Sequence, residues 1–110
     1  MIARLWTGRT RPEDADAYEE LLRTEILPHI AEESSDGYRG AEVLRREREE
    51  DVEFLTVLRF ETEADLRSFA GEEETERAVV PEAARRLLVS FDREARHYRR
   101  VLLARESGEG

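Results

Sequence analysis

The stretch from Val52 to Phe60 restricts the fold more than any other part of the sequence. Its β-branched and aromatic residues favour a strand, and side chains alternate between the two faces of a strand. One face carries four apolar side chains: Val52, Phe54, Leu58 and Phe60. The other face carries Leu55 and Val57, interrupted by Arg59. Because both faces are apolar, a sheet containing this strand needs a cover on each side.

The N-terminal part predicts a strand followed by an amphipathic helix. Residues Ile2–Arg9 alternate as a strand with Ile2, Arg4 and Trp6 on one face and Ala3, Leu5 and Thr7 on the other. Thr10 and Glu13 are spaced as a capping box, which predicts that the helix begins there. An apolar stripe then follows helical spacing: Ala15, Tyr18, Leu21, Leu22, Ile26, His29 and Ile30. Pro28 predicts a kink or a restart, and residues 34–37 predict the turn that ends the helix.

The rest of the chain predicts a hairpin, two helices and a final strand. Residues Tyr38–Arg48 and Asp51–Glu61 form the hairpin. Residues Thr62–Ala70 form a short helix, capped by Thr62 with Asp65 three residues on and stopped by Gly71. We expect a second helix over Glu76–Val89, with a break or a first turn at Pro81, and a long strand over Ser90–Ala104. Residues 1–104 would then form one domain, and 105–110 a frayed, Gly-rich tail.

The predicted order of elements is strand, helix, strand, strand, helix, strand. This is the ferredoxin-like βαββαβ plan of an α+β protein with a four-stranded antiparallel sheet. Right-handed crossovers place both helices on one face of the sheet. The other apolar face is then uncovered, and pairing with a second copy through a two-fold axis would cover it. We therefore expect a homodimer.

Composition excludes several classes of function. The net charge is −9, which opposes a nucleic-acid partner. No apolar run approaches the roughly 18 residues of a membrane span, and the absence of cysteine fits a reducing cytoplasm. The acidic runs show no metal-ligand spacing with histidine, so no metal is expected. No phosphate loop or dinucleotide motif is present, so no nucleotide or flavin cofactor is expected on that ground.

The sequence resembles the antibiotic biosynthesis monooxygenase family of the dimeric α/β-barrel superfamily. The resemblance covers residues 1 to 104 and rests on these segments: the opening Met1–Arg9, the turn Gly37–Gly40, the strand Glu53–Phe60, the helix end Ser68–Gly71 and the closing His97–Val101. It implies a ferredoxin-like fold, a dimeric barrel and a pocket between sheet and helices. Members include cofactor-free oxygenases of aromatic polyketides, quinol oxygenases and heme-degrading enzymes.

The sequence departs from two branches of that family. The heme-degrading branch carries an Asn on the first strand, and a Trp and a histidine ligand in the second helical region. Here the first strand has no Asn, Phe69 is nearest the Trp position, and no histidine lies between Gly71 and Ser90. The cofactor-free branch uses Trp, Tyr, Asn and His or Arg. Since the chain contains no Asn, only part of that set carries over.

Three residues are candidates for catalysis. Trp6, the single tryptophan, either walls an aromatic pocket or fills the core. His29 lies on the apolar stripe and is either a general base or a helix-end residue. His97 is the better candidate for a base. It and Tyr98 point to opposite faces of the last strand, so they cannot share one site unless the strand bulges.

Three further residues are candidates for substrate binding. Arg59 lies among apolar residues, so it either pairs with a carboxylate across the sheet or meets an anionic ligand. Arg4 stands beside Trp6 on the first strand, and Tyr38, like Tyr18, could line the pocket mouth.

The resemblance implies a cofactor-independent monooxygenase acting on a small electron-rich aromatic molecule, such as an anthrone or a hydroquinone. A histidine would take a phenolic proton, and the pocket would hold the resulting anion. Two alternatives remain open: a non-catalytic dimer of the same fold that binds a ligand or a partner, and an isomerase or cyclase. A closed pocket lined by Trp6 and a histidine favours the enzyme, whereas a filled interior favours the binding protein.

Overall fold

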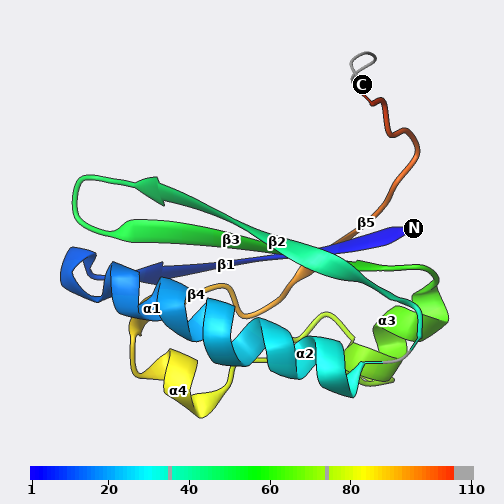
Figure 1. Ribbon diagram of the computed structural model, residues 1–110, viewed down its shortest axis with the longest axis horizontal. Helices are drawn as coiled ribbons and strands as arrows, with labels where there is room; N and C mark the ends of the chain where they lie inside the picture. The colour runs from blue at the N-terminus through cyan, green and yellow to red at the C-terminus, as the bar shows by residue number, and fades with distance from the viewer. Residues whose placement is uncertain (35, 74, 106–110) are drawn as a thin grey trace.

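The computed structural model describes residues 1–34, 36–73 and 75–105 and confirms the α+β class with the ferredoxin-like plan (Figure 1). The strands are β1 (Ile2–Thr10), β2 (Tyr38–Glu47), β3 (Val52–Phe60), β4 (Leu88–Phe91) and β5 (Arg96–Arg99). A helical run follows β1: a 3-10 turn (Pro12–Asp14), α1 (Ala15–Leu21), a π turn (Leu22–Ile26) and α2 (Leu27–Glu33). The later helices are α3 (Glu63–Ala70) and α4 (Glu82–Arg85).

The antiparallel sheet has the order β2-β3-β1, and β4 and β5 share the outer edge of β1. β4 pairs with the second half of β1 and β5 with the first half. This register places Arg4 between Leu58 of β3 and His97 of β5. Trp6 lies opposite Thr56, two residues further along the same face. The antiparallel pairing therefore brings residues from both ends of the chain to one place on the sheet.

The helices all lie on one side of the sheet, and the core lies between them (Figure 1). The face of β3 that the sequence marked as most apolar is the covered one, and it packs against α1, α3 and α4. The core consists of two clusters of buried side chains: Ala15, Tyr18, Leu22, Val52, Phe54 and Ala84 in one, and Ile2, Leu58, Phe60 and Leu66 in the other. Burial of these side chains supplies the main stabilisation of the fold.

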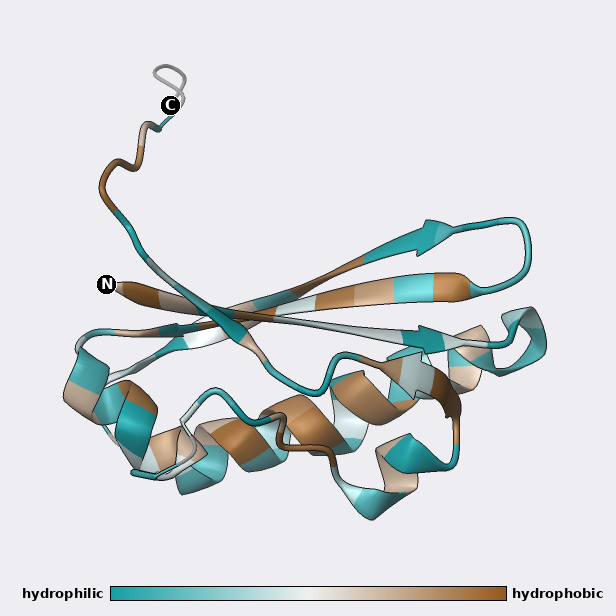
Figure 2. Ribbon diagram, turned by 180° about the vertical axis from the view of Figure 1, so that it is seen from behind, coloured by the Kyte–Doolittle hydropathy of each residue, from teal (hydrophilic) through white to brown (hydrophobic). Residues whose placement is uncertain are grey.

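The opposite side of the sheet carries no helix, and we refer to it as the open face. Register places its apolar side chains together: Ala3, Leu5, Leu44, Leu55 and Val57. Leu44 is 50% exposed there, and Tyr98 of β5 is 53% exposed. The segment Val101–Leu103 leaves the sheet on the same side and is coloured as hydrophobic in Figure 2. Its three side chains are highly exposed.

Pro28 lies in the first turn of α2, so the α-helix restarts there, as one of the two predicted outcomes. The run widens into the π turn just before α2, and the Leu27 N–H donates to the Leu22 carbonyl five residues back. Proline cannot donate a hydrogen bond, and a π turn loosens the ladder at that point. The predicted capping box at Thr10 and Glu13 is wrong: no side chain caps this end, and the Thr10 hydroxyl donates to the Arg11 carbonyl.

The helix predicted over Glu76–Val89 is wrong except for α4. Arg77 forms an isolated antiparallel bridge with Glu94, and residues 76–78 run beside residues 93–95. The Ala78 N–H donates to the Arg93 carbonyl (2.8 Å) and the Ala95 N–H to the Glu76 carbonyl (2.7 Å). These backbone groups are therefore used between segments and not along a helix. Pro81 has extended backbone angles and lies just before α4, so it starts the helix and does not interrupt it.

The single strand predicted over Ser90–Ala104 is also wrong, because the chain forms two short strands that end at Arg99. Asp92 still donates its N–H to the Thr7 carbonyl of β1, and residues 93–95 then leave that edge to pair with residues 76–78, which separates β4 from β5. The pairing ends at the start of β1, where the Arg100 N–H donates to the Met1 carbonyl (2.9 Å), and residues 101–105 form no strand. Arg105 of the predicted tail is exposed, while residues 106–110 lie outside the described residues, as does Ser35 of the predicted turn.

Helix α3 depends on the capping box that the sequence indicates at Thr62. The Thr62 hydroxyl accepts from the Asp65 N–H, and the Asp65 carboxylate accepts from the Thr62 N–H. We predict that Thr62→Ala lowers the free energy of unfolding by about 1 kcal/mol, because it leaves an N-terminal N–H without an acceptor. Urea denaturation measures this. Thr24→Ala, inside the π turn, is the control, and an equal loss in both variants would contradict the capping role.

Candidate functional site

Arg4 is the central residue of the candidate site. Its side chain is carried by the middle strand of the sheet and is buried, with 4% of the residue exposed. Its guanidinium donates to the Thr75 carbonyl (2.7 Å), to the Arg77 carbonyl (2.9 Å) and to Nε2 of His97 (2.8 Å). It also lies 5.6 Å from the centre of the Phe69 ring. Arg4 thus ties β1 to β5 and to the segment that replaces the predicted helix.

Arg4 has no carboxylate partner among the described residues. Three of the five guanidinium N–H groups are used, and the other two make no hydrogen bond with the described part of the chain. Burial lowers the pKa of Arg4 to about 10, because desolvation disfavours the charged form. The group is still a cation at neutral pH. An uncompensated buried cation with donors to spare is suited to an anionic oxygen.

His97 is held as a neutral acceptor by this arrangement. The Arg4 guanidinium can only donate, so the lone pair on Nε2 faces it and the ring proton belongs on Nδ1. Burial and the Arg4 charge lower the pKa of His97, and Glu76 and Glu63 act in the opposite direction. His97 can accept a proton at Nε2 only if Arg4 releases that nitrogen.

Trp6 contributes its ring to the site, whereas its indole N–H is already used. The N–H donates to the Asp92 carbonyl at 2.7 Å. A Cβ on Gly8 would lie 3.3 Å from the Trp6 ring, so the glycine allows the ring to lie flat along the strand. Phe91 packs against it with 5.6 Å between ring centres. The indole can therefore wall a pocket, but it cannot also donate to a substrate in this arrangement.

An apolar cavity of about 60 Å3 lies between the sheet and the helices, beside Arg4 and Trp6. Its floor includes Thr56 and Leu58 of β3, and the π turn supplies Leu22 and Ile26. The other lining residues are Tyr18, Leu27, Ile30, Phe69, Val79, Val80, Pro81 and Ala84. Within this lining the polar groups are Arg4, Tyr18, Thr56 and the Trp6 ring nitrogen. Few polar groups in an apolar cavity is the composition of a small-molecule site.

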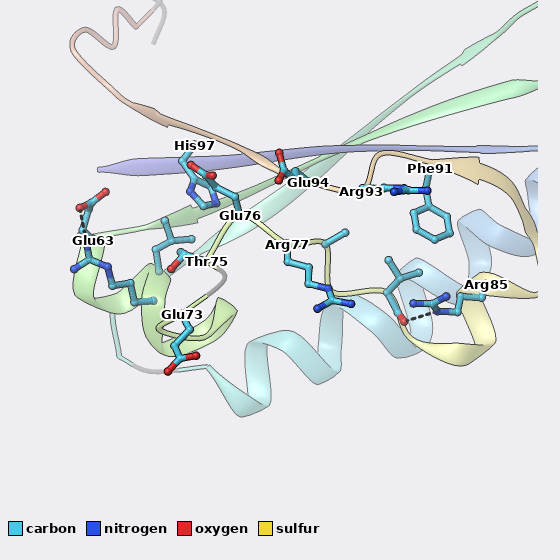
Figure 3. A pocket seen from close by; sticks show the side chains of 14 residues that line it. Glu63, Glu73, Thr75, Glu76, Arg77, Arg85, Phe91, Arg93, Glu94 and His97 are labelled. Carbon is cyan, nitrogen blue, oxygen red and sulfur yellow. Dashed lines mark hydrogen bonds and ion pairs between the residues drawn. The ribbon is translucent and has the colours of Figure 1, made fainter.

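A much larger polar groove of about 930 Å3 lies on the other side of Arg4 and is open to solvent (Figure 3). Its walls are mostly charged side chains, among them Glu63, Glu76, Arg93 and His97. Thr75 and Arg77, whose carbonyls bind Arg4, also line it. Charged walls open to water favour ions and exchangeable protons over an aromatic ring. Arg4 and His97 thus separate the apolar cavity from the solvent-filled groove.

The structure brings only part of the predicted site together. Trp6 and Arg4 share the covered face, as the alternation of the first strand predicted. His97 joins them there and Tyr98 lies on the open face, a choice that the sequence left undecided. Arg59 lies on the open face as well, where it pairs with Glu42 at 2.9 Å, the alternative that the sequence left open. Tyr38 packs on Phe60, with ring centres 5.7 Å apart, and does not line the cavity.

His29 is exposed on the outer side of α2, so its place on the apolar stripe is wrong. It forms a group with Glu32 and Glu33 in which potential ligand atoms lie within 4.8 Å of one another. These three exposed side chains are the group in the described part of the chain that could hold a metal ion, and the sequence gave no sign of it. The sequence did not single out Thr56 of the cavity, and it pointed to Phe69 only as the nearest match to a Trp of the heme-degrading branch. It also gave no sign of the two carbonyls that bind Arg4 at the edge of the groove. Backbone carbonyls leave no signal in a sequence.

Comparisons with known proteins show the fold. A scan against protein-family models and a search of curated proteins gave no match. Among solved structures, the chain is similar to a crystal structure from Bacillus cereus described as a "putative antibiotic biosynthesis monooxygenase". The TM-score is 0.65 at 17% identity, covering 99% of this chain and 98% of that chain. This likeness confirms the fold that the resemblance implied. None of the helices in the described part of the chain is long and apolar enough to cross a membrane.

The Arg4–His97 contact predicts a specific pH dependence. The pKa of folded His97 lies below the ordinary value of 6.5, so below pH 6.5 the unfolded chain binds more protons. Neutral His97 therefore stabilises the fold fully above pH 6.5. This stabilisation is lost as the pH falls toward the pKa of His97 in the folded protein. We predict that the stability difference between wild type and His97→Gln shrinks over this range, as followed by urea denaturation.

NMR titration of the imidazole gives the pKa of folded His97 directly, and comparison with the His97→Gln variant assigns its resonance. A midpoint at or above 6.5 would contradict the neutral, Arg4-bound imidazole. The groups facing His97 are Arg4, Glu63 and Glu76. Since the two carboxylates raise its pKa, Glu76→Gln should lower the midpoint further.

Proposed function

We propose that the protein is a cofactor-independent monooxygenase that oxidises a small electron-rich aromatic molecule. The observation that carries the proposal is the buried Arg4 guanidinium, which has no carboxylate partner among the described residues and lines an apolar cavity walled by Trp6. The fold shared with the structure from Bacillus cereus agrees with this general kind of activity.

The chemistry begins with ionisation of the substrate. A phenol bound beside Arg4 has its pKa lowered, because a nearby cation favours the phenolate. An anion in an apolar cavity is also a better electron donor, since no water shell stabilises its charge. The two unused N–H groups of Arg4 would hold the phenolate oxygen, and the Trp6 and Phe69 rings would pack on the aromatic faces.

His97 gives the phenolic proton a route out of the cavity. When Arg4 turns toward the oxygen of a bound phenol, Nε2 of His97 loses its donor and becomes free to accept the phenolic proton. The other side of the imidazole belongs to the groove, where Glu63 and Glu76 interact with it (Figure 3). The proton can then pass to solvent. In this scheme, the hydrogen bond between Arg4 and His97 keeps the base inactive until a substrate is bound.

The reaction needs no reductant other than the substrate. A hydroquinone reacting with one dioxygen gives a hydroxyquinone and one water: one oxygen atom enters the ring and the other leaves as water. The ring loses four electrons and dioxygen gains four, with the two displaced hydrogens leaving in the water. The first step is electron transfer from the bound phenolate to dioxygen, followed by formation of the C–O bond.

The size of the cavity favours a single ring. Pockets for drug-sized molecules measure roughly 300–1,000 Å3, whereas this cavity measures about 60 Å3. A three-ring anthrone would require the walls to move apart over much of the helical layer. A single hydroquinone ring requires a smaller shift, for which the segment Val79–Pro81 on the rim is suited because Val79 is 54% exposed. We therefore favour a hydroquinone over an anthrone.

A binding protein of the same fold is the second candidate. Two observations favour it: the cavity is small, and His97 lies outside its lining with Nε2 occupied by Arg4. Such a protein would hold a phenolate without passing electrons to dioxygen. An isomerase or cyclase would use the same cavity and base, and would also consume no oxygen.

We predict that the chelator-treated protein consumes dioxygen in the presence of a hydroquinone faster than the uncatalysed reaction. Arg4→Gln, Trp6→Phe and His97→Ala should each reduce the rate, by about 10- to 100-fold for Arg4→Gln, because a charged hydrogen bond is lost. An oxygen electrode measures the rate, with anthrone as the larger substrate. Arg59→Gln is the matched control, since it removes an arginine from the open face.

No uptake by folded wild-type protein would contradict the oxygenase. Ligand binding that persists in that case would favour the binding protein, and turnover without oxygen would favour the isomerase or cyclase. Equal losses in Arg4→Gln and Arg59→Gln would contradict the assignment of the cavity. Circular dichroism checks that each variant is folded.

We also propose that the protein acts as a homodimer, formed through the open face. The open face is apolar at its centre, and the Arg59–Glu42 pair shows that its charged groups are largely neutralised. The exposed apolar segment Val101–Leu103 leaves the chain on the same side and could extend the contact onto a second copy. An apolar sheet face of this kind is uncommon on a monomer.

We predict that sedimentation velocity gives a dimer and that Leu44→Glu gives a monomer, because a charge would be buried at the centre of the interface. Val79→Glu is the matched control, since Val79 is exposed to the same degree on the helical side. A monomer in the wild type, or an equal effect of the two substitutions, would contradict the open face as the interface.

A further inference from the structure

Tyr18 of α1 has a buried hydroxyl that no described residue uses. The residue is 2% exposed, and its ring packs edge-on against Phe54, with ring centres 4.9 Å apart at 75°. It lines the apolar cavity. Its hydroxyl makes no hydrogen bond with any residue that the structure describes, although buried polar groups nearly always have a partner.

The Tyr18 hydroxyl is also not sealed inside the protein. Among the described residues, only Oγ of Ser34 is a side-chain polar atom that is both fully shielded from solvent and without a hydrogen-bond partner. The Tyr18 hydroxyl also lacks a partner, so it is not fully shielded. The hydroxyl of Tyr18 therefore reaches space that a water-sized molecule can enter. Because the residue as a whole is almost completely covered, the cavity that it lines is the space available to it.

Tyr18 and Arg4 lie at opposite ends of the cavity. Tyr18 packs on Phe54, which lies opposite Gly8, whereas Arg4 lies opposite Leu58. Leu58 is four residues further along β3 than Phe54, a separation of roughly 13 Å between their Cα atoms. The Trp6–Thr56 pair lies between them. The cavity is thus a slot with an aromatic wall in the middle and a hydrogen-bond donor at each end.

We propose that this slot selects an aromatic ring with oxygens at opposite ends, one anionic and held by Arg4, the other neutral and accepting a hydrogen bond from Tyr18. The inference rests on the proposed function, which requires only the anionic oxygen. It adds a second point of recognition and narrows the substrate to the para-hydroquinone class.

Tyr18 fits the role of a neutral donor. Burial raises its pKa to about 12, so it remains protonated at any ordinary pH and cannot act as the base. During oxidation of a para-hydroquinone, the second oxygen changes from a hydroxyl to a carbonyl as it loses its proton to solvent. A carbonyl is purely an acceptor, so the hydrogen bond from Tyr18 suits the oxidised ring better than the reduced one.

Binding of two probes to wild type and Tyr18→Phe tests the proposal without turnover. The first probe, 4-hydroxybenzaldehyde, has a phenolic oxygen and a carbonyl at opposite ends of one ring. The second, 4-(trifluoromethyl)phenol, is of similar size and is also an acidic phenol, but it lacks the second oxygen. Titration followed by ultraviolet absorbance gives both the Kd and the fraction bound as phenolate. Tyr98→Phe, on the open face, is the control for loss of a tyrosine hydroxyl.

We expect Tyr18→Phe to weaken binding of 4-hydroxybenzaldehyde about five- to tenfold, while binding of 4-(trifluoromethyl)phenol and the phenolate fraction of both stay unchanged. Equal weakening of both probes, or no weakening of the first, would overturn the role of Tyr18 and leave the Arg4 site intact. Failure of wild type to bind either probe would overturn both. Tyr18-dependent binding without oxygen uptake would support the slot and contradict the oxygenase.

Discussion

The burial of the Arg4 charge organises one half of the structure. A buried guanidinium is costly unless its donors are satisfied, and here the acceptors come from the segment after α3 and from β5. Thr75 and Arg77 can offer their carbonyls to Arg4 because residues 75–78 form a turn and a bridge to Glu94 and not a helix. A helix would have used those carbonyls internally. One charge on the middle strand thus fixes the path of a segment more than seventy residues away.

The parts of the fold that depend on local pattern could be predicted. Alternation along Val52–Phe60, the hairpin and the capping box at Thr62 all act over a few residues, so the first two thirds of the topology follow from them. The last third could not be predicted, because its conformation depends on pairing between residues 76–78 and 93–95 and on Arg4. Val80 and Ala84 have helical spacing, but they line the cavity from a loop and from the short helix α4.

The candidate site was predictable to the extent that strand alternation governs it. Arg4, Trp6 and His97 share a face because their strands pair in a fixed register. His29 and Arg59 lie outside the cavity lining, for reasons that strand alternation does not cover. His29 follows Pro28 on the exposed side of α2, whereas Ile26 and Ile30 of the same predicted stripe line the cavity. Which face of β3 the helices cover depends on the crossovers, and this decided that Arg59 lies away from the cavity.

The position of Trp6 has a practical consequence. The chain contains one tryptophan, and its indole forms part of the cavity wall with the N–H fixed on the Asp92 carbonyl. Intrinsic indole fluorescence therefore originates from a single, oriented chromophore at the place where a ligand would bind. An aromatic phenolate seated beside it would quench the emission or accept its excitation energy, whereas binding on the surface of the helices would leave the emission nearly unchanged. The protein carries its own optical reporter of cavity occupancy.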